Sequence, residues 1–220
     1  MLKELLEKIQ TLSRTQTPFD VSRFNDPVAE KTLWTPAKGG GANFKTHNLV
    51  KVDYSRIEFR SSVGAKLFYL IFLLVGLGVM IGVSVSKISD GTFGFNWETF
   101  LMLTFGSIFA GVGGGLLYYG SAPVVFDKKA GYFWKGRKSP REVFNKSSIK
   151  HLAKLEDVHA IQLISEFVWG NKSSYHSYEI NLVLKDASRI NVIDHGNIKS
   201  IRENAETLSA FLDKPVWYAV

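Results

Sequence analysis

The chain of 220 residues contains no cysteine. Disulfide bonds, thiolate metal sites and thiol catalysis are therefore excluded, and nothing in the composition points to an oxidising compartment. Histidine is also scarce, and its positions show neither the H-E-x-x-H spacing nor the paired carboxylates typical of metal sites. We therefore expect no metal and no cofactor. The five histidines are His47, His151, His159, His176 and His195.

Motifs for phosphate binding and nucleophilic catalysis are missing as well. The glycine run at 39–41 follows Lys38 and leads into no G-K-[ST] sequence after a strand, so we interpret it as a flexible loop. No G-x-S-x-G nucleophile elbow accompanies the neighbours Asp194 and His195, and 194–197 is interpreted as a turn before the last helix. The sequence therefore predicts that the protein is no enzyme.

Charge is absent from two long stretches of the chain. The 20 residues between Lys66 and Lys87 carry no charge, and neither does 99–126. About 20 apolar helical residues cross the hydrocarbon core of a bilayer, and soluble domains rarely need two such runs close together. We predict a transmembrane hairpin at 65–121, with spans at about 67–86 and 99–120. Because neither span has an ionisable residue in its interior, we do not expect transport of ions or protons.

The basic residues predict the orientation of this hairpin. Residues 1–66 hold 11 Lys and Arg, the loop 87–98 holds one, and 120–220 holds 15. Cytoplasmic segments carry the excess of positive charge, so both termini are expected in the cytoplasm. With no cleavable signal peptide at the N-terminus, we predict an integral protein of a bacterial inner membrane.

Small residues recur every four positions in both spans. Such faces let helix backbones approach closely. We expect the two spans to pack on each other; the alternative is that a second face of the second span, with Ser107, Gly111 and Gly115, recruits another subunit. The residues predicted for helix packing are Gly78, Gly82, Gly106, Ala110 and Gly114.

The segment before the first span has two parts. Apolar residues spaced by three and four predict an amphipathic helix at 1–14, which packs on the protein itself or binds a membrane surface or partner. Prolines and the glycine run predict an extended arm after it. Alternation in NLVKVDYSRIEFR then predicts a β-hairpin, with strands at 48–52 and 56–60. Residues 15–64 are thus an arm and hairpin that join the soluble domain.

The remaining 122–220 reads as a β domain ended by a helix. Strands are predicted at 123–126, 132–134, 160–168, 178–184 and 189–193. Ile201, Ala205 and Leu208 lie on a helical stripe, Ser200 and Glu203 have capping-box spacing, and Pro215 stops the helix. The predicted fold class is an α+β membrane protein, in which a transmembrane hairpin joins an antiparallel, pleckstrin-homology-like β domain capped by a C-terminal helix.

Several segments carry a family resemblance. Two spans are followed by VVFDKKAGYFWKG, a basic stretch, SIKHLAKLEDVHAIQL, YEINLVLKDASRINVIDHG and NAETLSAFLDKPVW. This order resembles bacterial two-span membrane proteins with a pleckstrin-homology-like cytosolic domain, and is remotely similar to the membrane factor family that assists photosystem I assembly. The resemblance covers about 66–217, and it implies an anchored scaffold.

A basic stretch follows the second span and is the strongest functional candidate. Cations close to an anionic leaflet gain about 1 kcal/mol each. We expect these residues to contact anionic lipid headgroups or a protein partner; the alternative is that they only set the topology. Nucleic-acid binding is not expected, because the aromatic residues at 132–134 lie on a predicted strand beside a turn. The predicted contact residues are Lys128, Lys129, Lys135, Arg137, Lys138 and Arg141.

Three functions remain open from the sequence. The first is a membrane-anchored interaction or assembly protein whose β domain contacts a partner or anionic lipid. The second is a membrane-embedded immunity protein that neutralises a toxin, using small-residue helix faces. The third, an enzyme acting on lipid, lacks a visible nucleophile, base or metal. We favour the first.

Overall fold

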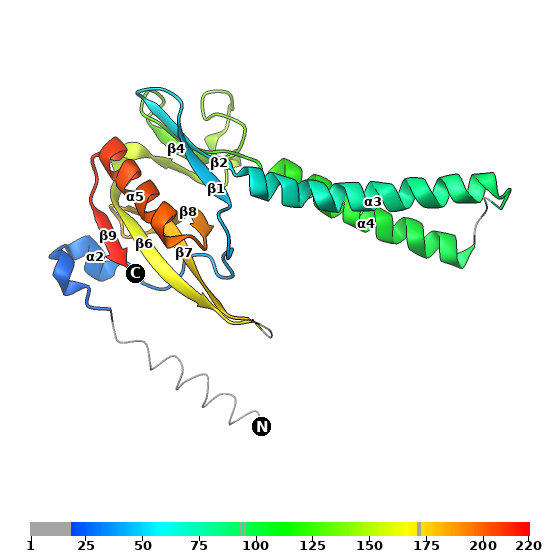
Figure 1. Cartoon of the computed structure of the whole chain (residues 1–220). Helices are drawn as coiled ribbons and strands as arrows, with labels where there is room; N and C mark the ends of the chain where they lie inside the picture. The colour runs from blue at the N-terminus through cyan, green and yellow to red at the C-terminus, as the bar shows by residue number, and fades with distance from the viewer. Residues whose placement is uncertain (1–18, 93, 95, 171–172) are drawn as a thin grey trace.

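A computed structural model of the chain describes residues 19–92, 94, 96–170 and 173–220. It has two parts, a β-rich domain and a helical hairpin that projects from it (Figure 1). The predicted amphipathic helix at 1–14 lies outside the described residues. The chain is thus of the α+β class, with two apolar helices, sheets that are mainly antiparallel, and a helix near the C-terminus.

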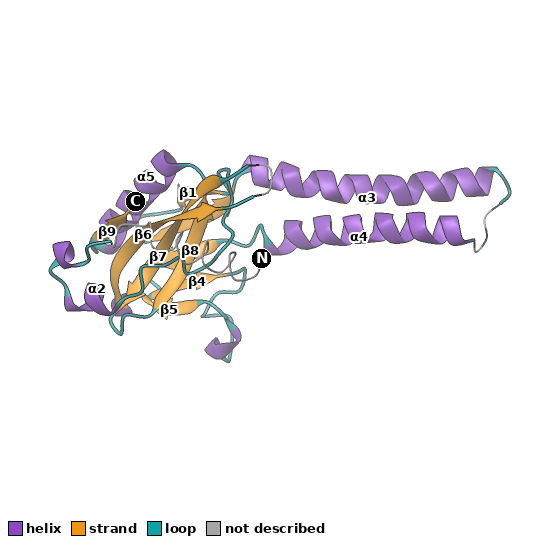
Figure 2. Cartoon of the chain, turned by 90° about the horizontal axis from the view of Figure 1, so that it is seen from below, coloured by secondary structure: helices purple, strands orange, loops and turns teal. Residues whose placement is uncertain are grey.

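The projecting hairpin consists of α3 (Val63–Ser89) and α4 (Trp97–Tyr119). Both helices are long and apolar enough to cross a membrane. Side-chain oxygens cap both N-termini, since Ser62 accepts from the backbone N–H of Ala65 and Asn96 accepts from that of Thr99. The two helices run side by side along their length (Figures 1 and 2).

A five-stranded antiparallel sheet contains both connections to the hairpin. The strands are β1 (His47–Lys51), β2 (Arg56–Ser61), β3 (Val124–Asp127), β4 (Tyr132–Lys135) and β5 (Leu152–Lys154), in that order. α3 follows β2 and α4 precedes β3, and these two strands are neighbours, with Phe59 opposite Val124. Both helices therefore leave from one end of adjacent strands. The predicted hairpins at 48–60 and 123–134 are confirmed.

A second sheet has four strands in the order β8-β7-β6-β9. They are β6 (Val158–Val168), β7 (Tyr175–Leu184), β8 (Arg189–His195) and β9 (Val216–Ala219). The pairs β6–β7 and β7–β8 are antiparallel, but β9 pairs with β6 in parallel. The predicted antiparallel β domain thus consists of two sheets, which are antiparallel except where β9, a strand that the sequence did not predict, pairs with β6. β8 also continues through Asp194 and His195, where the sequence suggested a turn.

The C-terminal helix α5 (Ile198–Leu212) packs on the domain core through Ile201, Ala205 and Leu208, which are fully buried. This core joins apolar side chains of both sheets, among them Phe59 and Leu163. The predicted capping box is wrong at its first residue, because Asn197 is the N-cap and its side-chain oxygen accepts from the backbone N–H of Ser200. Pro215 follows the helix end, as predicted.

The arm before β1 packs on the four-stranded sheet. It forms a short 3-10 helix, η1 (Ser22–Phe24), and α2 (Pro27–Lys31), where a loop or extended arm was predicted. Rings of Phe24 and Trp34 stack at 5.2 Å between centroids, and both contact Trp217 of β9. These aromatic contacts hold the arm against the domain.

Candidate functional site

A cavity of about 570 Å³ lies where the arm, the two sheets and the two long helices meet. Tyr69 of α3 and Tyr119 of α4 line it at the end from which the helices leave the domain. Polar and charged side chains line the rest, including Lys38 from the arm, His47 from β1, Lys135 from β4, and Asn191 and Asp194 from β8. Seven titratable side chains, three of them tyrosines, line this cavity.

Lys135 is the central cation of this cavity. Its Nζ donates to Oδ1 of Asn191 at 3.2 Å, the one acceptor it has within the described part of the chain. Burial lowers its pKa to about 8, and the positive charge of Lys38 acts in the same direction. Asp194 and Glu179 oppose this shift without cancelling it. The ammonium group is thus only partly compensated, with two N–H donors to spare.

The other charged groups of the cavity are partly paired with each other. Lys38 lies 3.8 Å from Asp194, and its side chain is 64 % exposed. The hydroxyl of Thr46 donates to the backbone oxygen of Asp194 at 2.8 Å, so Nδ1 of His47, 2.9 Å from the same hydroxyl, must be the donor in that contact. Burial lowers the pKa of His47 to about 4, which leaves the ring neutral at pH 7.

The carboxylate of Glu179 holds the arm against the domain, and all of its hydrogen-bond acceptor positions are used. This buried carboxylate accepts from the backbone N–H of Ala37 at 2.6 Å and of Lys38 at 3.2 Å. It also accepts from the side-chain amides of Asn181 at 2.7 Å and Asn191 at 3.4 Å. The same carboxylate therefore fixes the arm and the amide that binds Lys135.

The glycine run has a packing role in the structure. The backbone N–H groups of Gly40 and Gly41 donate to the carboxylate of Glu166. A Cβ at Gly41 would lie 2.1 Å from Oγ of Ser177, so only glycine fits there. Since Glu166 already occupies these amides, they offer no phosphate cradle. The loop predicted at 39–41 is present, but it is docked on β6 and β7.

The six basic residues predicted as one contact surface lie in two groups. Lys128 and Lys129 are in the β3–β4 turn, over the rings of Phe211 and Tyr54, and Arg141 donates to the backbone oxygen of Lys129. Arg137 donates to the backbone oxygen of Tyr118 at 3.1 Å, at the end of α4, and Lys138 follows it. Lys135 lines the cavity described above and, together with Arg137 and Lys138, a second cavity of about 320 Å³ at the end of α4.

Only some of the residues predicted for helix packing lie at the contact between α3 and α4. The helices approach each other most closely at three glycines, Gly76, Gly106 and Gly113. A Cβ at Gly76 would lie 2.2 Å from the backbone nitrogen of Ala110. By contrast, within the described residues a Cβ at Gly78 or Gly82 would meet nothing within 4 Å, and the same holds for Gly111, Gly114 and Gly115. Gly106 and Ala110 are therefore in the contact, whereas Gly78, Gly82 and Gly114 are outside it.

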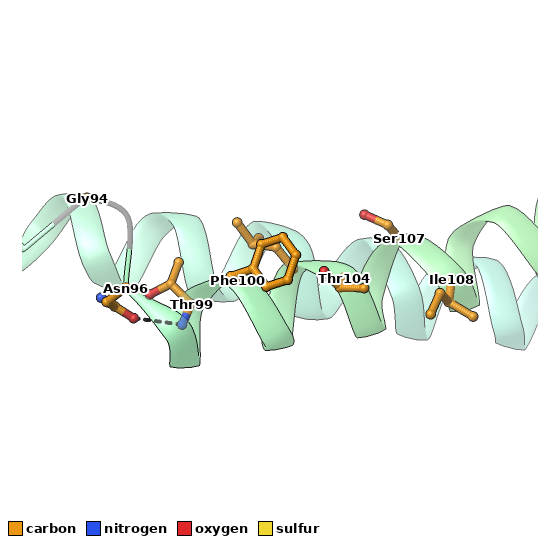
Figure 3. A pocket seen from close by; sticks show the side chains of 8 residues that line it. Gly94, Asn96, Thr99, Phe100, Thr104, Ser107 and Ile108 are labelled. Carbon is orange, nitrogen blue, oxygen red and sulfur yellow. Dashed lines mark hydrogen bonds between the residues drawn. The ribbon is translucent and has the colours of Figure 1, made fainter.

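A groove of about 620 Å³ follows α4 near the connection between the two helices (Figure 3). Its floor is mostly apolar, with Phe100 and Ile108, and carries the hydroxyls of Thr104 and Ser107. At its end the side-chain oxygen of Asn96 accepts from the N–H of Thr99, drawn as a dashed line in Figure 3. Among its described lining residues there is no acidic or basic side chain that could activate these hydroxyls.

Sequence reasoning did not identify the cavity, although it named several of its residues, among them Lys38 and the glycine run. It predicted Lys135 for a lipid or partner contact, found no metal-site spacing around His47, and interpreted Asp194 as the start of a turn. Comparison with protein-family models, curated proteins and solved structures found no match for the chain.

Proposed function

We propose that the chain is a membrane-anchored interaction or assembly protein, held in a bacterial inner membrane by α3 and α4. One observation carries the anchoring, namely that the outer faces of the hairpin are apolar and exposed, with Ile81 62 % and Ile108 57 % exposed. Exposed apolar surface costs about 25 cal/mol per Å² in water, whereas lipid removes this cost. Helices of 27 and 23 residues are about 40 and 35 Å long, enough for a core of about 30 Å.

Aromatic and basic residues at the ends of the hairpin support the proposed orientation. Trp97 at one end and Tyr119 at the other are 66 % and 77 % exposed, as expected for residues in the two interfacial belts. Arg137 contacts the domain end of α4 through the backbone oxygen of Tyr118. The domain end carries the basic residues and would therefore face the cytoplasm, with both termini on that side.

The β domain would be the part that binds a partner, in the manner of pleckstrin-homology-like domains. The β3–β4 turn is separated from the helix end of the sheet by the four residues of β3, about 13 Å of strand. This exceeds the Debye length of about 8 Å at physiological ionic strength. Lys128, Lys129 and Arg141 therefore suit an acidic protein surface, whereas Arg137 and Lys138 suit anionic lipid headgroups.

Cross-linking in native membranes tests this assignment. The full chain is purified after mild cross-linking, alongside two charge-reversal variants, Lys128→Glu/Lys129→Glu/Arg141→Glu and Arg137→Glu/Lys138→Glu. We expect a stoichiometric partner that the first variant loses and the second retains. Recovery of the same partner with both variants would contradict the role of the turn, and recovery of the chain alone would contradict the interaction function.

The open face of α4 favours a second candidate, the membrane-embedded immunity protein. Gly111, Gly114 and Gly115 form a small-residue surface that no described atom outside their own helix approaches within 4 Å of an added Cβ. Such a surface suits a helix of a pore-forming toxin. In that case Gly111→Leu would abolish protection of cells from the toxin, and a single toxin-like partner would be recovered after cross-linking.

A further inference from the structure

We propose that the cavity between the arm and the two sheets binds a phosphate group, and that this phosphate belongs to the headgroup of a membrane phospholipid. This inference rests on the proposed anchoring and names a ligand for the same face of the domain. Lys135 would be the principal contact, with Lys38 as the second cation.

The ammonium group of Lys135 has unused hydrogen-bond donors and a positive charge that its neighbours compensate only in part. It has three N–H donors, and Asn191 uses one of them. The charged groups that shift its pKa are Lys38, Asp194 and Glu179, and the ring of His47 is neutral at pH 7. Three more cations, Arg137, Lys138 and Lys150, line the neighbouring cavity with it. Two carboxylates do not outweigh burial and the repulsion by Lys38, since the pKa of Lys135 stays below its usual value. An anion in the cavity would supply the missing compensation.

The carboxylates of Glu179 and Asp194 cannot supply the anion that Lys135 lacks. Glu179 already accepts from the amides of Ala37, Lys38, Asn181 and Asn191. Asp194 lies nearest to Lys38, at 3.8 Å, which is longer than a hydrogen bond. A ligand with several acceptor oxygens would match the two spare donors of Lys135 and the exposed ammonium of Lys38.

The position of the cavity beside the two long helices indicates that the phosphate belongs to a lipid headgroup. The cavity is lined by Tyr69 and Tyr119, one from each long helix, at the end where the helices leave the domain. Phe44 also lines it and contacts Phe68 of α3, with ring centroids 6.4 Å apart, and both rings are partly exposed. If the helices span a bilayer, this opening lies at headgroup level, and acyl chains would extend along α3 and α4.

Binding to the full-length, delipidated protein in an uncharged detergent tests the proposal. Native mass spectrometry would follow titration with phosphatidylglycerol, phosphatidylethanolamine, diacylglycerol and inorganic phosphate. We expect both phospholipids to bind and diacylglycerol not to bind. If inorganic phosphate competes with the phospholipids, the site binds phosphate from any source. If inorganic phosphate does not compete, the site is specific for the lipid. Equal binding of diacylglycerol, or no binding of any ligand, would overturn the proposal.

Matched variants separate the cavity from general surface charge. Lys135→Met keeps an unbranched side chain one atom shorter and without charge, and we expect phospholipid binding at least about tenfold weaker. Lys129→Met, in the distant β3–β4 turn, should bind as the wild type does. Should Lys135→Met not fold, Lys38→Met provides the test, because its side chain is 64 % exposed and its loss should leave folding intact. Unchanged binding in the folded variant would refute the site.

Failure of this test and failure of the proposed anchoring are distinguishable. The binding measurement is made in detergent and does not depend on how the hairpin lies in a bilayer. Conversely, the position of the hairpin in native membranes does not depend on Lys135. A protein that spans the membrane but shows no phosphate-dependent binding would refute only the ligand.

Discussion

Replacing Gly76 by alanine should weaken the contact between α3 and α4. The new Cβ would lie 2.2 Å from the backbone nitrogen of Ala110 and 2.5 Å from the backbone oxygen of Gly106. Ordinary contacts of this kind begin at 3.4 Å, so the backbones must separate by about 1.2 Å. Overpacking of this kind costs about 1–3 kcal/mol, and a gap of about 1 Å loses up to half of the dispersion energy along the contact.

Gly78→Ala is the matched control, because within the described residues its Cβ would meet nothing within 4 Å. Alanine is favoured over glycine in a helix by about 1 kcal/mol, so this variant should be as stable as the wild type or more stable. The propensity gain is common to both variants, so we expect them to differ by the overpacking cost, about 1–3 kcal/mol, in reversible unfolding of the reconstituted protein by detergent. Equal stability would refute the packing at Gly76 and favour the predicted contact at Gly78 and Gly82.

Three further predictions concern the β domain. Asn197→Ala should lower the free energy of unfolding by about 1 kcal/mol through loss of the α5 cap, whereas Ser200→Ala should change it little; the reverse order in chemical denaturation would restore the predicted capping box. Burial lowers the pKa of His195 to about 4 from 6.5, so its contribution to stability is present above pH 6.5 and is lost as the pH falls through about 4. This contribution is about 3 kcal/mol. The free energy of unfolding should therefore fall less between pH 7 and pH 4 in His195→Leu than in the wild type, and an equal fall in both would refute the role of His195. Glu179→Gln should release the arm, because it replaces an acceptor of four hydrogen bonds; limited proteolysis should then cut near Ala37 faster than in the wild type, and unchanged cutting would count against this role.

Patterns between residues close in sequence were enough to predict the long helices, the first β-hairpin and the C-terminal helix. Charge-free runs located α3 and α4, alternation located the hairpin β1–β2, and a period of 3.6 located α5. Each of these signals acts between residues close in sequence. The missed elements depend on distant partners, since β9 is four residues long and is a strand because it pairs with β6, more than fifty positions earlier. The two short helices of the predicted arm were missed for the same reason, because the arm is ordered by packing of its aromatic residues on Trp217.

The sites were harder to predict than the elements. Sequence spacing shows that small residues share a helix face, but not which face meets the other helix. Successive helix residues are turned by about 100°, so Gly78 lies about 200° from Gly76 and points away from α4 when Gly76 points toward it. The cavity joins Lys38, His47, Lys135 and Asp194, which come from four separate segments. Only the packing of the two sheets against each other and the docking of the arm bring these residues together.

Labelling of single introduced cysteines tests the anchoring most directly, because the chain has no cysteine of its own. Asp90→Cys lies at the connection between α3 and α4, and Lys150→Cys lies in the β domain. In intact cells, the account predicts that an impermeant maleimide labels Asp90→Cys and leaves Lys150→Cys unlabelled until the cells are opened. Labelling of both positions only after the cells are opened, together with release of the protein by carbonate, would contradict a membrane-spanning hairpin.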